Sequence, residues 1–162
     1  MKAFETGSCM QGVLPTEAMY FKEEIVCEVL SIPIQKPDME RMLDVMIWPE
    51  IVHVSLVDTP KGRSYEGQNL SGLKLEAEVN LKEKVTYVAN EPKQSAHAAY
   101  YETLKSVFVV LPEKSPNGTD ICELFRANRL TVCAYVEDVC ARMLDSRTIH
   151  QCVMLFVDIK LC

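Results

Sequence analysis

The chain has 162 residues, of which 48% are hydrophobic and 25% are charged, and its net charge is −6. This length and composition are typical of one globular domain with its own core, and not of a disordered chain. The negative charge argues against a generic nucleic-acid binder, which needs a cationic face to displace counterions from phosphates. Apolar runs such as VFVVL are far shorter than the roughly 20 residues that cross a bilayer, so we expect no membrane insertion.

The N-terminal segment and the cysteines indicate the compartment. Residues 1–22 lack the apolar stretch of a secretory signal, and we expect an arm or a first hairpin there. The seven cysteines form an odd set without a C-x-x-C pair, which favours reduced thiols over a disulfide framework. We therefore expect a cytoplasmic protein whose residues 23–162 form a single β domain.

A helical pattern follows the first predicted strand, residues 23–34. In KPDMERMLDVMIWP, Met39, Met42, Leu43 and Met46 recur at helical spacing. Pro37 can occupy a first helical turn, and Pro49 forbids continuation. The sequence therefore predicts a core-packing helix over 37–49, followed by a second strand over 51–58.

The clearest strand signal runs from Leu73 to Ala89, where apolar residues occupy the odd positions. A period of two predicts a strand with one buried face and one solvated face. Glu83 and Val88 break the alternation, and the segment is about twice as long as a usual strand, so we expect a bend or bulge near Glu83. The glycine-rich loop before it, 58–74, is predicted to be an exposed connection suited to partner contact through Gln68 and Asn69.

The stretch YVANEPKQSAHAAYYE, residues 87–102, has the mixture of side chains that an active site uses. Asn90 and Pro92 favour a chain reversal there, with a returning strand after it. The alternation of a strand then separates His97 and Tyr101 from Tyr100. We therefore interpret the stretch as a hairpin in which His97 has a structural hydrogen-bonding role.

The C-terminal half contains further strands at 106–112, 130–144 and 147–162, with a short helix capped by Asp120 between the first two. In the last strand His150, Cys152, Met154 and Phe156 share one face. At least six strands with short polar connections favour an antiparallel β-sandwich or barrel, with one or two short helices.

Catalytic and metal-binding patterns are weak. His150 and Cys152 share a face with Cys133 or Cys140 as possible neighbours, but the latter two differ by seven positions and would point to opposite faces of a regular strand. A structural zinc site normally has a closer Cys/His pair. No G-x-S-x-G or H-E-x-x-H motif occurs, so we expect neither a metal, nor another cofactor, nor an enzyme.

Four motifs in order carry a family resemblance: EGQNLSG (66–72), YVANEPKQSAHAA (87–99), YVED (135–138) and DSRTI (145–149). Together they resemble the SPOCS domain of spore-forming Clostridia, over about residues 23–161. In a longer family member this domain accompanies a LysM module and helps to assemble the spore coat, and this chain resembles a stand-alone form. The family has no established active-site residues. The position of Tyr100 is often a second histidine in the family, so no histidine pair is present.

The resemblance implies a non-enzymatic sporulation module that binds a protein partner or itself, in the mother-cell cytosol or at the forespore surface. The alternative is a small-ligand or carbohydrate-binding β domain whose stacking and hydrogen-bonding groups are Tyr87, Tyr100, Tyr101, Trp48 and Gln68. A hydrolase or zinc protein is the third hypothesis. The candidate interaction residues are Gln68, Asn69, His97, Tyr100, Tyr101, Arg147, His150, Cys152 and Phe156.

Overall fold

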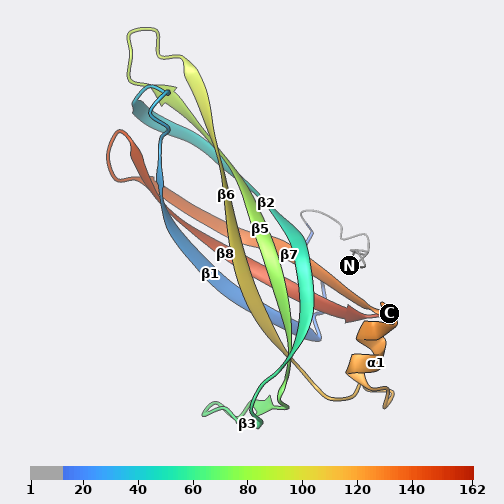
Figure 1. Cartoon of the computed structure of the whole chain (residues 1–162). Coiled ribbons are helices and arrows are strands. Elements are labelled where there is room, and N and C mark those ends of the chain that lie inside the picture. The colour runs from blue at the N-terminus through green and yellow to red at the C-terminus, as the bar shows by residue number, and fades with distance from the viewer. Residues whose placement is uncertain (1–12) are drawn as a thin grey trace.

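The computed structural model describes residues 13–162 and folds them mainly into two three-stranded antiparallel sheets (Figure 1). The first sheet has the order β1-β8-β7, with β1 at Tyr20–Ser31, β8 at Thr148–Leu161 and β7 at Leu130–Met143. The second has the order β2-β5-β6, with β2 at Met39–Asp58, β5 at Leu73–Ala89 and β6 at Ala96–Leu111. The predicted mainly β, sandwich-like architecture is confirmed.

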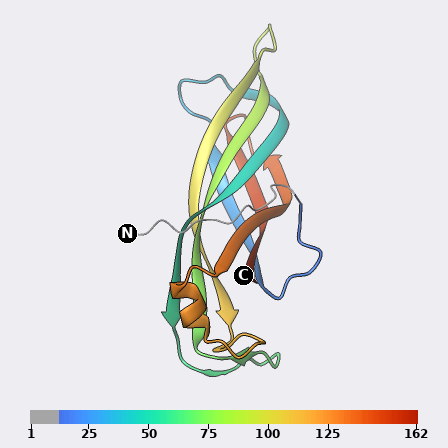
Figure 2. The ribbon, with the colours of Figure 1, turned by 90° about the vertical axis from the view of Figure 1, so that its right-hand side faces the viewer.

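The two sheets pack face to face, and their strands cross at an angle (Figures 1 and 2). β2 lies beside β7, and β1 lies beside β6, so both sides of the sandwich are closed by neighbouring strands. One end carries the helix α1, Ile121–Arg126, and a two-stranded ribbon of β3, Gly62–Arg63, and β4, Asn69–Leu70. The turn between β5 and β6 lies at the opposite end (Figure 1).

The predicted helix over 37–49 is wrong, because this segment belongs to the long strand β2. Register shifts against β5 occur between Met39 and Arg41 and between Met42 and Asp44. Each bulge adds one residue, so inward-facing positions are three apart rather than two, and Met39, Met42 and Val45 all contact the core. Residues three apart also share one face of a helix, and this explains the wrong prediction. Pro49 is tolerated because β2 is an edge strand.

The bulge considered near Glu83 is also absent. β5 pairs with β6 without a register shift from Leu73 to Val88, and the irregularities lie in β2 instead. Glu83 keeps its place in the alternation and points into the sandwich with 2% exposure. Glu83 is therefore a buried polar side chain in a strand whose pairing register has no bulge at this position.

The short helix α1 is confirmed. Asp120 is its N-cap, and its Oδ1 accepts hydrogen bonds from the backbone amides of Cys122 at 2.8 Å and Glu123 at 3.3 Å. Ile121 and Leu124 are buried in the hydrophobic core at this end of the sandwich. The helix thus covers the end of the sandwich that carries the ribbon.

A small hydrophobic cluster of Cys133, Tyr135 and Phe156 packs on the outer side of the β1-β8-β7 sheet, and two further clusters fill the space between the sheets. The larger fills the half near α1, with Leu75, Leu81 and Leu155 among its fully buried members. The smaller lies at the other end and includes Tyr87 and Ile149. Apolar burial between two sheets is the main stabilising contribution for such a fold.

The N-terminal part and the cysteines differ in detail from expectation. Residues 1–12 of the predicted arm lie outside the described residues, and β1 begins at Tyr20, within the last residues of that arm. Cys27 and Cys152 form a disulfide between β1 and β8, and Cys133 is also disulfide-bonded, so the expectation of reduced thiols is wrong for these three cysteines. No helix in residues 13–162 is long and apolar enough to span a membrane.

Candidate functional site: the outer face of the β1-β8-β7 sheet

The outer face of the β1-β8-β7 sheet, which we call the outer face, is built from residues that point away from the sandwich. The antiparallel register places them in rows of three, one from each strand in the order β1, β8, β7. The rows are Ile25–Met154–Asp138, Cys27–Cys152–Cys140 and Val29–His150–Arg142. Of the sequence candidates, His150 and Cys152 are therefore brought together at the centre of this face.

Exposed apolar side chains lie along the β1 side of this face. Ile25 is 62% exposed, Val29 is 61% exposed, and Met154 of β8 is 36% exposed. We call Ile25, Val29 and Met154 the apolar strip. Ile25 and Val29 are not among the residues predicted from the sequence, although the alternation of a strand around the inward-facing Val26 would have placed Ile25 on the solvent face, and Val29 follows it at a spacing of four.

Phe156 occupies a different environment from the one expected for an exposed contact residue. It is 8% exposed, stacks on Phe21 with ring centroids 5.4 Å apart, and lies 6.3 Å from the ring of Tyr135. Aromatic pairs at such distances stabilise packing beyond simple burial. Phe156 is thus covered by neighbouring aromatic side chains and does not belong to the solvent-exposed area of the outer face.

A bulge in β7 corrects the prediction that Cys133 and Cys140 point to opposite faces. The register shifts between Val136 and Asp138, so the strand has one extra residue between the two cysteines. Cys133 pairs with Asp158 and Cys140 with Cys152, and both β8 residues face outward. Residues 13–162 contain no group of three or more Cys, His, Asp or Glu side chains arranged to hold a metal ion.

His97 lies in a group that resembles a catalytic triad by composition. Its Nε2 lies 3.1 Å from Ser95 Oγ and 3.7 Å from Glu91 Oε1, and the Ser95 hydroxyl donates to the same Glu91 oxygen. In a triad the acid and the nucleophile bind opposite ring nitrogens, so that the imidazole can relay a proton. Here both use Nε2. The ring also stacks on Tyr87 at 5.8 Å, which fits the predicted structural role.

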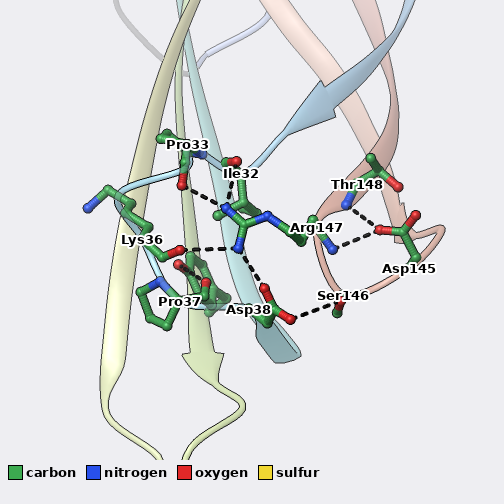
Figure 3. Close-up of polar contacts among 10 residues, drawn as sticks. Ile32, Pro33, Lys36, Pro37, Asp38, Asp145, Ser146, Arg147 and Thr148 are labelled. Carbon is green, nitrogen blue, oxygen red and sulfur yellow. Dashed lines mark hydrogen bonds and ion pairs between the residues drawn. The ribbon is translucent and has the colours of Figure 1, made fainter.

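Arg147 joins the β7–β8 turn to the loop between β1 and β2 (Figure 3). Its Nη1 donates to the Lys36 carbonyl at 3.2 Å and to the Asp38 carboxylate at 2.6 Å. Its Nη2 donates to the carbonyls of Ile32 at 3.1 Å and Pro33 at 2.8 Å. The two Nη atoms are thus engaged within the chain, where they hold the ends of the two sheets together.

Gln68 and Asn69 are exposed at the ribbon, beside the start of β1. They line a hollow of about 570 Å³ together with Phe21 and Pro112. The backbone of Gln68 is held by Ser64, whose hydroxyl accepts from the Gln68 amide at 2.9 Å. These two candidates therefore lie at the end of the outer face, away from Cys152.

Tyr100 and Tyr101 are separated by the alternation of β6, as predicted. Tyr101 points inward and its hydroxyl donates to the Ser31 carbonyl at 3.0 Å, and burial raises its pKa. Tyr100 is 67% exposed on the opposite side of the sheet. A hollow of about 310 Å³ lies beside Tyr100, with Trp48 and Lys82 also in its lining.

A polar layer, formed by the buried Glu83 and Gln151 and the half-buried Glu28, separates the two hydrophobic clusters between the sheets. Glu83 and Gln151 come from the central strands of opposite sheets, and Gln151 pairs with Glu28 across β1 and β8. Burial raises the pKa of Glu83 to about 7; the neighbouring Gln151 amide opposes this shift and the charge of Glu28 adds to it. Thr103 donates to Glu28 Oε2 at 2.9 Å. The break in alternation at Glu83 was the one sequence signal for this layer.

No family model matches the chain, and no curated protein or solved structure is significantly similar to it. The resemblance to the SPOCS domain therefore rests on the four sequence motifs and stays a prediction. The structure places two of these motifs in structural roles: DSRTI contains Arg147 and its turn, and YVANEPKQSAHAA forms the β5–β6 hairpin.

Proposed function

We propose that the chain is a non-enzymatic protein-interaction module that self-associates through the outer face. The observation that carries this proposal is the apolar strip, in which Ile25 and Val29 are each more than half exposed and Met154 pairs with Ile25. Contiguous exposed apolar side chains on a sheet face usually mark association sites. A single such face can bind a second copy of itself around a twofold axis, which gives a closed dimer.

The absence of a proton relay at His97 supports the non-enzymatic part of the proposal. The resemblance to the SPOCS domain supports a role in sporulation, with the module at the forespore surface or in the mother-cell cytosol. The Cys27–Cys152 disulfide is unusual for a protein of a reducing cytosol, where persistent disulfides are rare.

Light scattering of the purified protein over a range of concentrations tests self-association. We expect the average mass to rise with concentration for the wild type and to stay monomeric for an Ile25→Glu/Val29→Glu double variant. Leu104→Glu is the matched control, because Leu104 is 60% exposed on the opposite sheet. A wild type that stays monomeric at every concentration would overturn self-association and direct the search to a different protein partner.

A second candidate function, saccharide binding, is favoured by the hollow beside Tyr100. The register aligns Trp48, Lys82 and Glu102 in one row across β2, β5 and β6, and these residues line the hollow with Tyr100. Exposed aromatic rings beside charged hydrogen-bonding groups suit a sugar ring, whose faces are apolar and whose edge is polar.

Intrinsic fluorescence tests this second candidate directly, because Trp48 is the only tryptophan in the chain. Titration with cellotetraose and with chitotetraose should shift the emission in a saturable manner, and Tyr100→Ala should weaken the response. Tyr65→Ala, an exposed tyrosine in the ribbon loop, is the control. Unchanged emission with both sugars would rule out saccharides of these two types as ligands.

A further inference from the structure

Three cysteines form one row across the outer face. Cys152, on the central strand β8, pairs with Cys27 of β1 on one side and with Cys140 of β7 on the other. Cys27 and Cys152 are joined by a disulfide, and Cys140 is an exposed free cysteine. A free thiol therefore lies directly beside a disulfide, in the neighbouring position of the same row.

The strand geometry allows Cys152 to bond to either neighbour. The Cα atoms of Cys27 and Cys152 are 4.1 Å apart, which is typical of a non-hydrogen-bonded antiparallel pair. The backbone of Cys152 then points toward β7, so Cys152 and Cys140 form the hydrogen-bonded type of pair, whose Cα atoms lie about 5.5 Å apart. That separation is within the usual range for disulfides, about 4.4–6.8 Å. The register therefore places Cys152 directly opposite both cysteines, with the closer approach to Cys27 and the wider one to Cys140.

We propose that this row is an intramolecular thiol–disulfide exchange site in which Cys27 and Cys140 compete for Cys152. The Cys140 thiolate attacks Sγ of Cys152, the Cys140–Cys152 bond forms, and the Cys27–Cys152 bond breaks. Cys27 leaves as a thiolate and takes up the proton that Cys140 lost. The number of disulfides is unchanged, so the step needs no oxidant or reductant, and the reverse step is the same reaction.

The exchange moves the crosslink from one side of the sheet to the other. In the observed linkage β1 is tied to β8, and in the alternative linkage β7 is tied to β8. The alternative linkage frees the exposed Cys27 thiol between Ile25 and Val29 of the apolar strip. The reaction lies within one chain, so it holds whether or not the outer face binds a second copy.

Two matched variants test the exchange. Purified Cys27→Ser and Cys140→Ser proteins are equilibrated in the same glutathione redox buffer, alkylated with N-ethylmaleimide, and mapped by mass spectrometry. Digestion with trypsin and a protease that cuts after Glu137 separates the Cys140 peptide from that of Cys133. We expect Cys27→Ser to form the Cys140–Cys152 disulfide, and Cys140→Ser to form Cys27–Cys152 as the one disulfide within this row.

The wild type provides a second measurement that needs no substitution. Time-resolved alkylation at pH 8 should place label on Cys27 as well as on Cys140, with a matching gain of the Cys140–Cys152 peptide. Cys162, another exposed free cysteine, reports ordinary thiol accessibility in the same sample. The proposal is overturned if wild-type Cys27 stays unlabelled throughout, or if folded Cys27→Ser keeps Cys140 and Cys152 reduced where Cys140→Ser closes its disulfide.

Discussion

Glu83 of β5 and Gln151 of β8 face each other at the centre of the sandwich, and the Gln151 amide is near enough to lower the pKa of Glu83. Among residues 13–162, however, neither side chain has a hydrogen-bond partner at normal distance and angle. Glu83 is 2% exposed and Gln151 is 1% exposed. Buried polar groups normally have partners, and each one left without a partner costs stability. The layer therefore weakens the middle of a core that is otherwise apolar, and its cost depends on the charge of Glu83.

The pH dependence of unfolding should reveal Glu83. Its pKa is raised from 4.5 to about 7, so between these values the folded protein holds a proton that the unfolded chain releases. Proton binding by Glu83 therefore stabilises the folded protein by its full amount, about 3 kcal/mol, below pH 4.5. This stabilisation is lost as the pH rises from 4.5 to about 7. Glu83→Gln should remove this part of the slope in urea unfolding and be more stable than the wild type at pH 8.

Glu102→Gln is the control for that measurement, because Glu102 is exposed on the neighbouring strand β6. Its unfolding free energy should follow the wild-type pH dependence. An identical slope between pH 5 and pH 7 in Glu83→Gln and the wild type would contradict the assignment of the pH effect to Glu83.

Arg147→Ala should destabilise the fold more than substitution of a partly exposed residue usually does. The substitution removes four hydrogen bonds from the guanidinium, three of them to backbone carbonyls of the β1–β2 loop. We expect a loss of about 2–3 kcal/mol in the free energy of unfolding. Arg147→Lys should recover only part of it, because an ammonium group cannot reproduce the planar fork. Arg142→Ala on the outer face is the control, and an equal loss there would refute the special role of Arg147.

Gly72→Ala and Gly67→Ala separate backbone strain from steric clash. Both glycines have positive φ, +84° and +90° respectively, so alanine is strained at both sites by about 1 kcal/mol. A Cβ at Gly72 would also lie 2.8 Å from the Thr59 carbonyl oxygen, whereas a Cβ at Gly67 would have no neighbouring atom within 4 Å. Thermal unfolding should therefore show a larger loss for Gly72→Ala. Equal losses would mean that the ribbon moves to relieve the clash.

Asp120→Ala tests the cap of α1. The Asp120 carboxylate satisfies two backbone amides at the start of this short helix, and loss of such a cap costs about 1 kcal/mol. Asp120→Asn retains an acceptor oxygen and should preserve most of the stability. We would abandon this assignment if both variants unfolded at the same denaturant concentration as the wild type.

Much of the fold was predictable because alternation is a local property of the chain. The buried odd positions of β5, the outward side of β8 and the split of Tyr100 from Tyr101 all follow from the period of two. The Asp120 cap was also visible, since its acceptor and donors lie within three residues. His150 and Cys152 were placed on one face for the same reason.

Other features depended on contacts between distant segments. The bulges in β2 follow from its pairing with β5, and in isolation the spacing of Met39, Met42 and Val45 is helical. The bulge in β7 decided that Cys140 shares a face with Cys133 and lies opposite Cys152. The register of β1 against β8 decided that Cys27 lies on the other side of Cys152.

The sequence by itself determined a mainly β domain and the alternating faces of its longest strands, because side-chain direction along a strand depends only on neighbouring residues. Only the tertiary structure decided which faces meet. It buried Glu83 opposite Gln151, engaged the Arg147 guanidinium within the chain, and aligned Cys27, Cys152 and Cys140 in one row. The physical reason is that strand register and sheet packing join residues far apart in the chain, and local patterns carry no information about those pairings.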